Sequence, residues 1–169
     1  LEAALELTQR LLAALEHAHA QGIVHRDVKP SNVLLPTPDW PLLADFGIAK
    51  LLEGADPDLT SAGQVIGTAA YMAPEQAAGE LVDARTDLYT VGVLLYELLT
   101  GQVPFGASPR SAVLARQTSE PPPAPRRINP KVPAAAELLV LRALAKRPDE
   151  RYQSAGDMAA DLKRLNAQA

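Results

Sequence analysis

The chain has 169 residues and a mass of 18.0 kDa, which is enough for one domain with a hydrophobic core and too short for two ordinary domains. Apolar residues make up 47% and charged residues 21%, and these proportions exclude a wholly disordered chain, a collagen and a coiled coil. The net charge of −4 argues against a broad nucleic-acid-binding face, and the absence of cysteine excludes a disulfide scaffold, thiolate zinc sites and cysteine nucleophiles.

The first segment has the pattern of an amphipathic helix. Leucines recur at helical spacing over residues 1–15, and Gly22 is suited to follow the end of the helix. A helix of about 20 residues is therefore predicted. The polar run over residues 23–32 is predicted to be a loop, because it contains Pro30 and no helical period.

Two short apolar runs, residues 33–35 and 42–44, are separated by a proline-rich turn. This pattern predicts the two strands of a small hairpin. Residues 48–72 show no sustained period and contain several glycines, so they are predicted to form a long loop. A loop of that length in a compact domain is usually functional.

The rest of the chain is predicted to be mostly helical. A helix is expected after Pro74, and the apolar segment 87–100 has almost no polar face, so it should be a helix buried on all sides. The proline-rich residues 121–133 should form an extended connector. Further helices are expected over residues 107–117, 134–146 and 154–165, the last with Ser154 as its N-cap. The pattern therefore predicts a mainly α domain with one β-hairpin.

Three short motifs stand in loops or directly after predicted strands. In chain order they are His25-Arg26-Asp27-x-Lys29-x-x-Asn32, Asp45-Phe46-Gly47 and Ala73-Pro74-Glu75. One of them alone would be weak evidence for any function. Their joint presence, in this order and on these elements, makes the combination specific.

Together these motifs resemble the catalytic loop, the metal-binding turn and the end of the activation segment of protein kinases. Lys29, two positions after Asp27, is typical of serine/threonine kinases, and residues 67–76 look like the substrate-docking segment of bacterial Hanks-type kinases. The resemblance implies the C-terminal lobe of a bacterial Hanks-type serine/threonine protein kinase. That lobe would occupy residues 1–169 as a partial kinase domain, with an activation segment over residues 45–75. In this mainly α fold the hairpin carries the catalytic loop and the Asp-Phe-Gly turn.

Phosphoryl transfer explains why these residue types occur together. The reaction needs a positioned hydroxyl and neutralised phosphate charge. Asp27 is a carboxylate that can accept or orient the substrate hydroxyl proton, and Lys29 can reach the transferring phosphate. Asn32 and Asp45 offer oxygen ligands that suit Mg²⁺, and pairing of the two strands should bring them together. The alternative for any one of these charges is an ordinary surface loop.

Further roles follow only from the resemblance. Thr68 would hydrogen-bond Asp27 and Lys29 as a catalytic residue. Arg26 would gather a phosphate on the activation loop, with Thr60 the preferred acceptor and Ser61 the second. The alternative is that both are plain loop hydroxyls.

Other positions are expected to be architectural, again by resemblance. Glu75 should pair with Arg151, and Asp87 should accept hydrogen bonds from the catalytic-loop backbone. His25 and Phe46 should belong to the second stack of side chains that the family has. The apolar support beneath the adenine would consist of Leu34, Leu94 and Leu98, for which plain core packing is the alternative. His19 is expected to be a satisfied structural histidine, since no second ligand lies at metal spacing.

The implied activity is transfer of the ATP γ-phosphate to serine or threonine hydroxyls of protein substrates, with Mg²⁺ and with Mn²⁺ as an alternative metal. The chain contains no Gly-rich phosphate loop and no lysine before His25, and it starts inside a helical pattern. We therefore expect a fragment that lacks its N-terminal β lobe, is inactive alone and takes that missing lobe as a partner.

Two other functions remain open. A non-catalytic docking or scaffold module would suit a missing lobe, but it predicts decayed catalytic positions. A small-molecule phosphotransferase of related fold would lack the Ala73-Pro74-Glu75 segment. No apolar stretch reaches the roughly 20 residues needed to span a bilayer. We therefore expect a cytoplasmic segment with no membrane or nucleic-acid contact and with any membrane anchor of the parent protein beyond residue 169.

Overall fold

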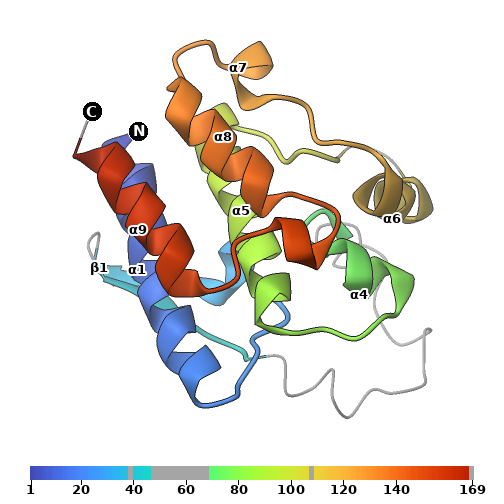
Figure 1. The fold of residues 1–169 in the computed structure, drawn as a ribbon, viewed down its shortest axis with the longest axis horizontal. Helices are drawn as coiled ribbons and strands as arrows, with labels where there is room; N and C mark the ends of the chain where they lie inside the picture. Colours follow the sequence, from blue (N-terminus) through green and yellow to red (C-terminus); the bar gives the residue numbers. More distant parts are fainter. Residues whose placement is uncertain (38–39, 47–68, 107–108, 168–169) are drawn as a thin grey trace.

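A computed structural model of the chain describes residues 1–37, 40–46, 69–106 and 109–167 (Figure 1). The described part is mainly helical with one two-stranded antiparallel sheet, which confirms the expected fold class. In chain order the elements are α1 (Glu2–Ala20), the 3-10 turn η1 (Pro30–Asn32), β1 (Val33–Thr37), β2 (Trp40–Leu43), α4 (Pro74–Ala78), α5 (Ala84–Thr100), α6 (Arg110–Ser119), α7 (Pro125–Ile128), α8 (Ala134–Ala143), the 3-10 turn η2 (Pro148–Glu150) and α9 (Ala155–Asn166).

Helix α5 forms the centre of the core. It starts at a capping box on Asp83, and its residues are buried from Thr86 to Tyr96. Helices α1 and α8 pack against it, and α1 also lies along α9, so the two ends of the described chain are close together (Figure 1). The prediction of a helix buried on all sides is wrong for the last turn, where Leu98 is 42% exposed.

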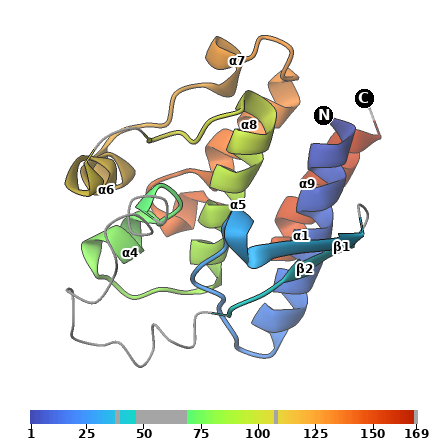
Figure 2. The same cartoon turned by 180° about the vertical axis from the view of Figure 1, so that it is seen from behind.

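The hairpin lies against α1 through its second strand (Figure 2). Leu34 pairs with Leu42, and the strands extend into Pro36 and Pro41, so they reach further toward the turn than predicted. Proline is tolerated there because each strand of a two-stranded sheet has an outer edge, where a missing N–H breaks no ladder bond. The loop that precedes β1 and the chain that follows β2 therefore meet at the base of the hairpin.

The remaining differences concern helix ends and one short helix. The expected extended connector contains α7, which begins at Pro125, a residue preorganised for a first helical position. Helix α6 begins after Pro109 rather than at residue 107. Helix α8 ends at Ala143, before the predicted residue 146: the N–H of Ala145 donates three residues back, to the carbonyl of Arg142, and the carbonyls of Ala145 and Lys146 accept hydrogen bonds from Arg151. No helix within the described ranges is both long and apolar enough to cross a membrane.

Candidate active site

The polar loop between α1 and β1 is held by one buried carboxylate. Asp87, near the start of α5, is 0% exposed and accepts hydrogen bonds from the backbone N–H groups of His25 and Arg26, both at 2.8 Å. His19 lies 2.8 Å from the same carboxylate through Nε2. The predicted anchoring by Asp87 is therefore confirmed, and His19 is a paired structural histidine, as expected.

Two predicted catalytic side chains and one predicted metal ligand come together in this loop. Lys29 forms an ion pair with Asp27 at 2.8 Å. The side-chain amide of Asn32 donates to the backbone carbonyl of Asp27 at 2.8 Å and to its carboxylate at 3.1 Å. The Asp27 and Lys29 side chains are 18% and 21% exposed, so the cluster is partly open to solvent. A carboxylate in this setting is positioned by neighbours on both sides and still accessible to a substrate group.

The base of the hairpin brings the second motif to the first. Ala44 donates its backbone N–H to the carbonyl of Asn32 at 2.8 Å, so Asp45 follows directly beside the residue that ends the catalytic loop. Asp45 is exposed. The Asn32 amide hydrogens face Asp27, and its Oδ1, which accepts from the Ser31 hydroxyl at 3.5 Å, is the side-chain atom that could coordinate a cation. An amide oxygen and a carboxylate on two adjoining segments fit the hard-oxygen preference of Mg²⁺.

Two positive φ angles mark the same two motifs. Among the described residues other than glycine, Arg26 (φ 68°) and Asp45 (φ 55°) are the ones in the left-handed region. That region is unfavourable for residues with a Cβ, and such strain gathers at functional sites when the surrounding structure enforces it. Both motifs are therefore held in conformations that the chain would not adopt alone.

His25 connects the two motifs and its proton position follows from its partners. The backbone N–H of Asp27 donates to Nδ1 at 3.2 Å, and Nε2 lies 3.0 Å from the carbonyl of Ala44. Since an N–H must donate and a carbonyl must accept, Nδ1 accepts and Nε2 is the nitrogen that donates to Ala44. The ring centroid lies 4.5 Å from that of Phe46 and the ring planes are inclined by 46°, so the two side chains are in contact.

The third motif is fixed to the core by the predicted ion pair. Glu75, 4% exposed, contacts Arg151 through two bonds of 2.8 Å and accepts a third bond from Thr86 at 2.7 Å. Burial alone would raise the pKa of Glu75, but the hydrogen bonds from Arg151 and Thr86 and the charge of Arg151 lower it overall. The pair is complete and buried, so it fixes the start of α4 relative to η2.

Two contacts of this region were missed from the sequence. Gln76 donates to the carbonyl of Arg26 at 2.7 Å and accepts from Ala73 at 3.1 Å, which ties α4 to the catalytic loop. Tyr71 donates to Glu97 on α5. The pKa of Tyr71 is raised, mainly by burial and further by the hydrogen bond to Glu97 and the negative charge of Glu97. Gln76 could have been found from its place in the first turn of a helix that begins with proline.

Several predicted residues are not brought into the cluster. Leu94 is buried, whereas Leu34 and Leu98 are 51% and 42% exposed. Two of the three side chains expected to lie beneath the adenine are therefore exposed to solvent in the described part of the chain. Gly47, Thr60, Ser61 and Thr68 lie outside the described residues.

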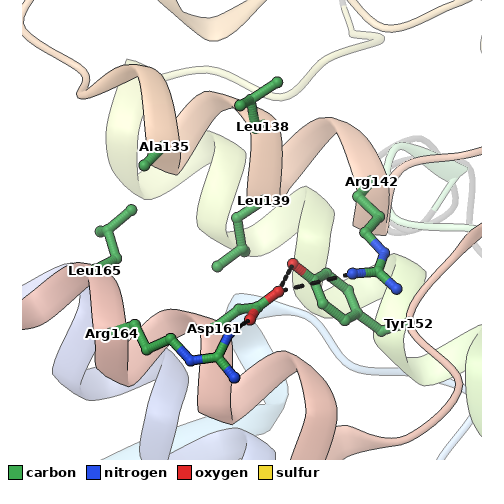
Figure 3. A pocket seen from close by; sticks show the side chains of 8 residues that line it. All are labelled: Ala135, Leu138, Leu139, Arg142, Tyr152, Asp161, Arg164 and Leu165. Atoms are coloured by element: carbon green, nitrogen blue, oxygen red, sulfur yellow. Dashed lines mark hydrogen bonds and ion pairs between the residues drawn. The ribbon is translucent and has the colours of Figure 1, made fainter.

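A pocket of about 310 Å³ lies elsewhere, between α8 and α9 (Figure 3). Arg142 lies 4.1 Å above the Tyr152 ring, while Asp161 accepts from Tyr152 at 3.0 Å and from Arg164 at 2.7 Å. None of the three motifs contributes to its lining, so it is not part of the candidate active site.

Comparison with known proteins identifies the family. A model of the protein kinase domain matches residues 2–161. This chain belongs to the protein kinase family. Serine/threonine-protein kinase PknB of Mycolicibacterium smegmatis is 44% identical over 163 residues, which cover 96% of this chain and 26% of that protein. Serine/threonine-protein kinase Pkn1 of Myxococcus xanthus is 46% identical over 156 residues, which cover 90% of this chain and 22% of that protein.

A solved structure supports the same assignment. The crystal structure of the Mycobacterium tuberculosis PknI kinase domain matches with a TM-score of 0.70 and 31% identity, covering 95% of this chain and 54% of that one. The chain thus spans about a quarter of the length of the curated relatives and about half of a solved kinase domain. The bacterial Hanks-type kinase and the helical lobe expected from the motifs are confirmed.

Proposed function

We propose that this chain is the large lobe of a serine/threonine protein kinase that transfers the γ-phosphate of ATP to hydroxyls of protein substrates. The observation that carries this proposal is the Asp27–Lys29–Asn32 cluster beside Asp45, a set of contacts suited to phosphoryl transfer. The relatives named above carry the serine/threonine kinase name, which supports the same reaction.

The proposed mechanism gives Asp27, Lys29, Asn32 and Asp45 separate roles. Asp27 accepts or orients the proton of the substrate hydroxyl, and Lys29, 2.8 Å from it, positions that carboxylate and stabilises negative charge on the transferring phosphoryl group. Asn32 Oδ1 and the Asp45 carboxylate would hold Mg²⁺. The bound metal would neutralise charge on the ATP phosphates.

The proposal includes a small lobe that covers the hairpin. Leu34, Leu35, Trp40 and Leu42 are between 44% and 62% exposed, and such an apolar surface on a short sheet is suited to contact with a nucleotide base and a second lobe. Residues 45–75 would form the activation segment. Within it Thr68 would bond Asp27 and Lys29, and phosphate on Thr60 or Ser61 would be held by Arg26.

Asp27→Asn tests the reaction. In a protein that joins this chain to a small kinase lobe, we expect turnover on a protein substrate to fall at least about a hundredfold, the scale for losing a general base. The matched control is Asp149→Asn, because Asp149 is exposed and its side chain hydrogen-bonds Arg147 at the surface. Unchanged turnover in Asp27→Asn, with control and variant equally folded by circular dichroism, would contradict the assigned role.

Asp45→Ala tests the metal site separately. The carboxylate is exposed, and the described residues hold no group of three or more histidine, aspartate or glutamate side chains placed to bind a metal. We expect Mg·ATP to bind at least about tenfold more weakly by calorimetry, while nucleotide without metal is unaffected. Equal Mg·ATP affinity in the two proteins would contradict the ligand assignment.

A further inference from the structure

Lys146 follows α8 and has an unusual environment for a lysine. Its Nζ lies 4.5 Å from the centroid of the Phe105 ring and 5.7 Å from that of Tyr89. It donates to the Tyr89 hydroxyl at 3.3 Å and to the carbonyl of Arg116, in the last turn of α6, at 3.4 Å. Both rings are buried, whereas Lys146 itself remains partly exposed. The amine therefore packs against the two aromatic rings and remains partly accessible to solvent.

Two aromatic rings and two hydrogen-bond acceptors favour the cationic form of Lys146, whereas its burial and the charge of Arg151 oppose it. No carboxylate lies within ion-pair distance of it among the described residues, and the buried Arg151 is a like charge. Burial, and then the charge of Arg151, lower the pKa of Lys146 to about 8, with Glu120 acting in the opposite direction. A larger share of this amine is neutral near physiological pH than for an exposed lysine, and the neutral amine is the nucleophile.

A buried chain of hydrogen bonds links Lys146 to the segment before α4. Tyr89, which accepts from Lys146, donates to the side-chain oxygen of Gln117 on α6. The amide of Gln117 donates to the carbonyl of Ala70 at 2.7 Å. Tyr89 and Gln117 are both 0% exposed, so water does not compete for these bonds. Ala70 lies in the segment that the sequence resemblance assigns to docking of protein substrates.

We propose that Lys146 is a site of acylation by acyl phosphates, and that its acylation loosens the segment around Ala70 and so weakens docking of protein substrates. The docking part of this inference rests on the proposed function. In the reaction the neutral Nζ attacks the acyl carbon, a C–N bond forms and the bond from that carbon to the phosphate oxygen breaks. Phosphate leaves with the electron pair, and the amine proton passes to water.

Acylation would change each contact of Lys146. The amide product carries no positive charge, so attraction to the Phe105 and Tyr89 rings is lost. One remaining N–H cannot serve both the Tyr89 hydroxyl and the Arg116 carbonyl. The added acyl group must also find room above Phe105, which is 3% exposed. The hydrogen bond between Tyr89 and Gln117 should weaken in consequence. The hydrogen bond from Gln117 to the carbonyl of Ala70 should weaken with it.

The first experiment measures the chemistry and needs no kinase activity. The protein is incubated with acetyl phosphate over a series of pH values, and acetylation of Lys146 is compared by mass spectrometry with the exposed Lys131 and Lys163. We expect an initial rate at neutral pH at least about tenfold above both comparators, since a pKa near 8 leaves far more neutral amine than the ordinary 10.5. The Lys146 rate should level off above pH 8 while the others keep rising. Equal rates, or the same pH profile at the three sites, would overturn the proposal.

The second experiment measures the coupling. Hydrogen exchange of the peptide over residues 69–78 should become at least about threefold faster after acetylation, and should not change in acetyl-phosphate-treated Lys146→Arg, which keeps the charge and cannot be acetylated in this way. Unchanged exchange in the acetylated protein would overturn the link to the docking segment.

In the two-lobed enzyme the same treatment should raise the KM for a protein substrate at least about threefold and leave the KM for ATP unchanged. In Lys146→Arg, the same treatment should leave both KM values unchanged. An unaltered KM for the protein substrate in the acetylated wild type would overturn the regulatory role. If the two-lobed enzyme has no activity at all, the proposed function fails, while the acetylation and exchange measurements still decide the site.

Discussion

Arg151→Ala would remove the centre of a buried polar network. Its guanidinium contacts Glu75 through two bonds of 2.8 Å and is 1% exposed. It also donates to three backbone carbonyls, those of Ala145 at 2.7 Å, Lys146 at 2.8 Å and Arg85 at 3.2 Å. After the change, Glu75 keeps its bond from Thr86 but has no cation, and the three carbonyls lose a charged donor.

The expected cost follows from this geometry. Removal of one partner of a buried ion pair destabilises a protein by about 3–5 kcal/mol, because the other charge stays buried without compensation. We expect a loss of about 4 kcal/mol for Arg151→Ala, a large share of the roughly 5–15 kcal/mol that holds a domain folded. With a urea dependence of about 2 kcal/mol per molar, the unfolding midpoint should fall by about 2 M.

Urea unfolding followed by circular dichroism measures this effect, with Arg147→Ala as the matched control. Arg147 is 71% exposed and pairs with Asp149 and Glu150 at the surface, so its removal should leave the midpoint unchanged. Equal midpoints for the two variants would refute the assignment of Arg151 as a structural centre.

The pH dependence gives an independent check of the same pair. Because the pKa of Glu75 in the fold lies below its ordinary 4.5, the stabilisation is fully present above that pH and is lost as the pH falls through the folded value. The difference in unfolding free energy between wild type and Arg151→Ala should therefore shrink in acid. A difference that stays constant down to acid pH would mean that the ion pair does not cause it.

Three further substitutions probe the scaffold. Asp87→Asn should lower the free energy of unfolding in urea by about 2–3 kcal/mol. The donors from His19, His25 and Arg26 share two carboxylate oxygens in the wild type, whereas an amide has one oxygen and places its NH₂ group against a donor. An unchanged unfolding midpoint would contradict the anchoring role of Asp87. Gly92→Ala should cost about 1–3 kcal/mol, because its Cβ would lie 2.8 Å from that of Ala143. Gly156→Ala should be neutral or stabilising, since its Cβ would meet only the movable end of Glu16; equal losses in the two glycine variants would contradict this contrast.

The sequence was sufficient for those parts of the fold where one local rule decides. Gly22 ends α1 with φ 73°, and Ser154 caps α9 through the N–H of Asp157, both as the local pattern indicates. The ion pair of Glu75 with Arg151 was also predicted, but through resemblance to a family and not through spacing. Resemblance supplied the long-range contacts that no short pattern contains.

The network behind Lys146 shows why the rest was not predicted. Gln117 lies on a short helix whose polar residues suggest an exposed face, yet it is 0% exposed. Its burial is explained only by partners far away in the chain, Tyr89 and the carbonyl of Ala70, which satisfy both ends of its amide. A buried polar residue of this kind has no periodic signal, since its position depends on where other elements pack.

The anchoring of the catalytic loop can be weighed against its strain. A non-glycine residue in the left-handed region costs about 1–3 kcal/mol, and Arg26 has φ 68°. Asp87 accepts two backbone hydrogen bonds from this loop, at 2.8 Å each, and a bond to a charged group contributes about 1.5–3 kcal/mol. The two bonds therefore outweigh the strain, and the conformation of Arg26 is imposed from α5. A charged residue in the largely buried helix α5 is thus explained by the backbone that it holds, which presents Asp27 to the solvent side of the site.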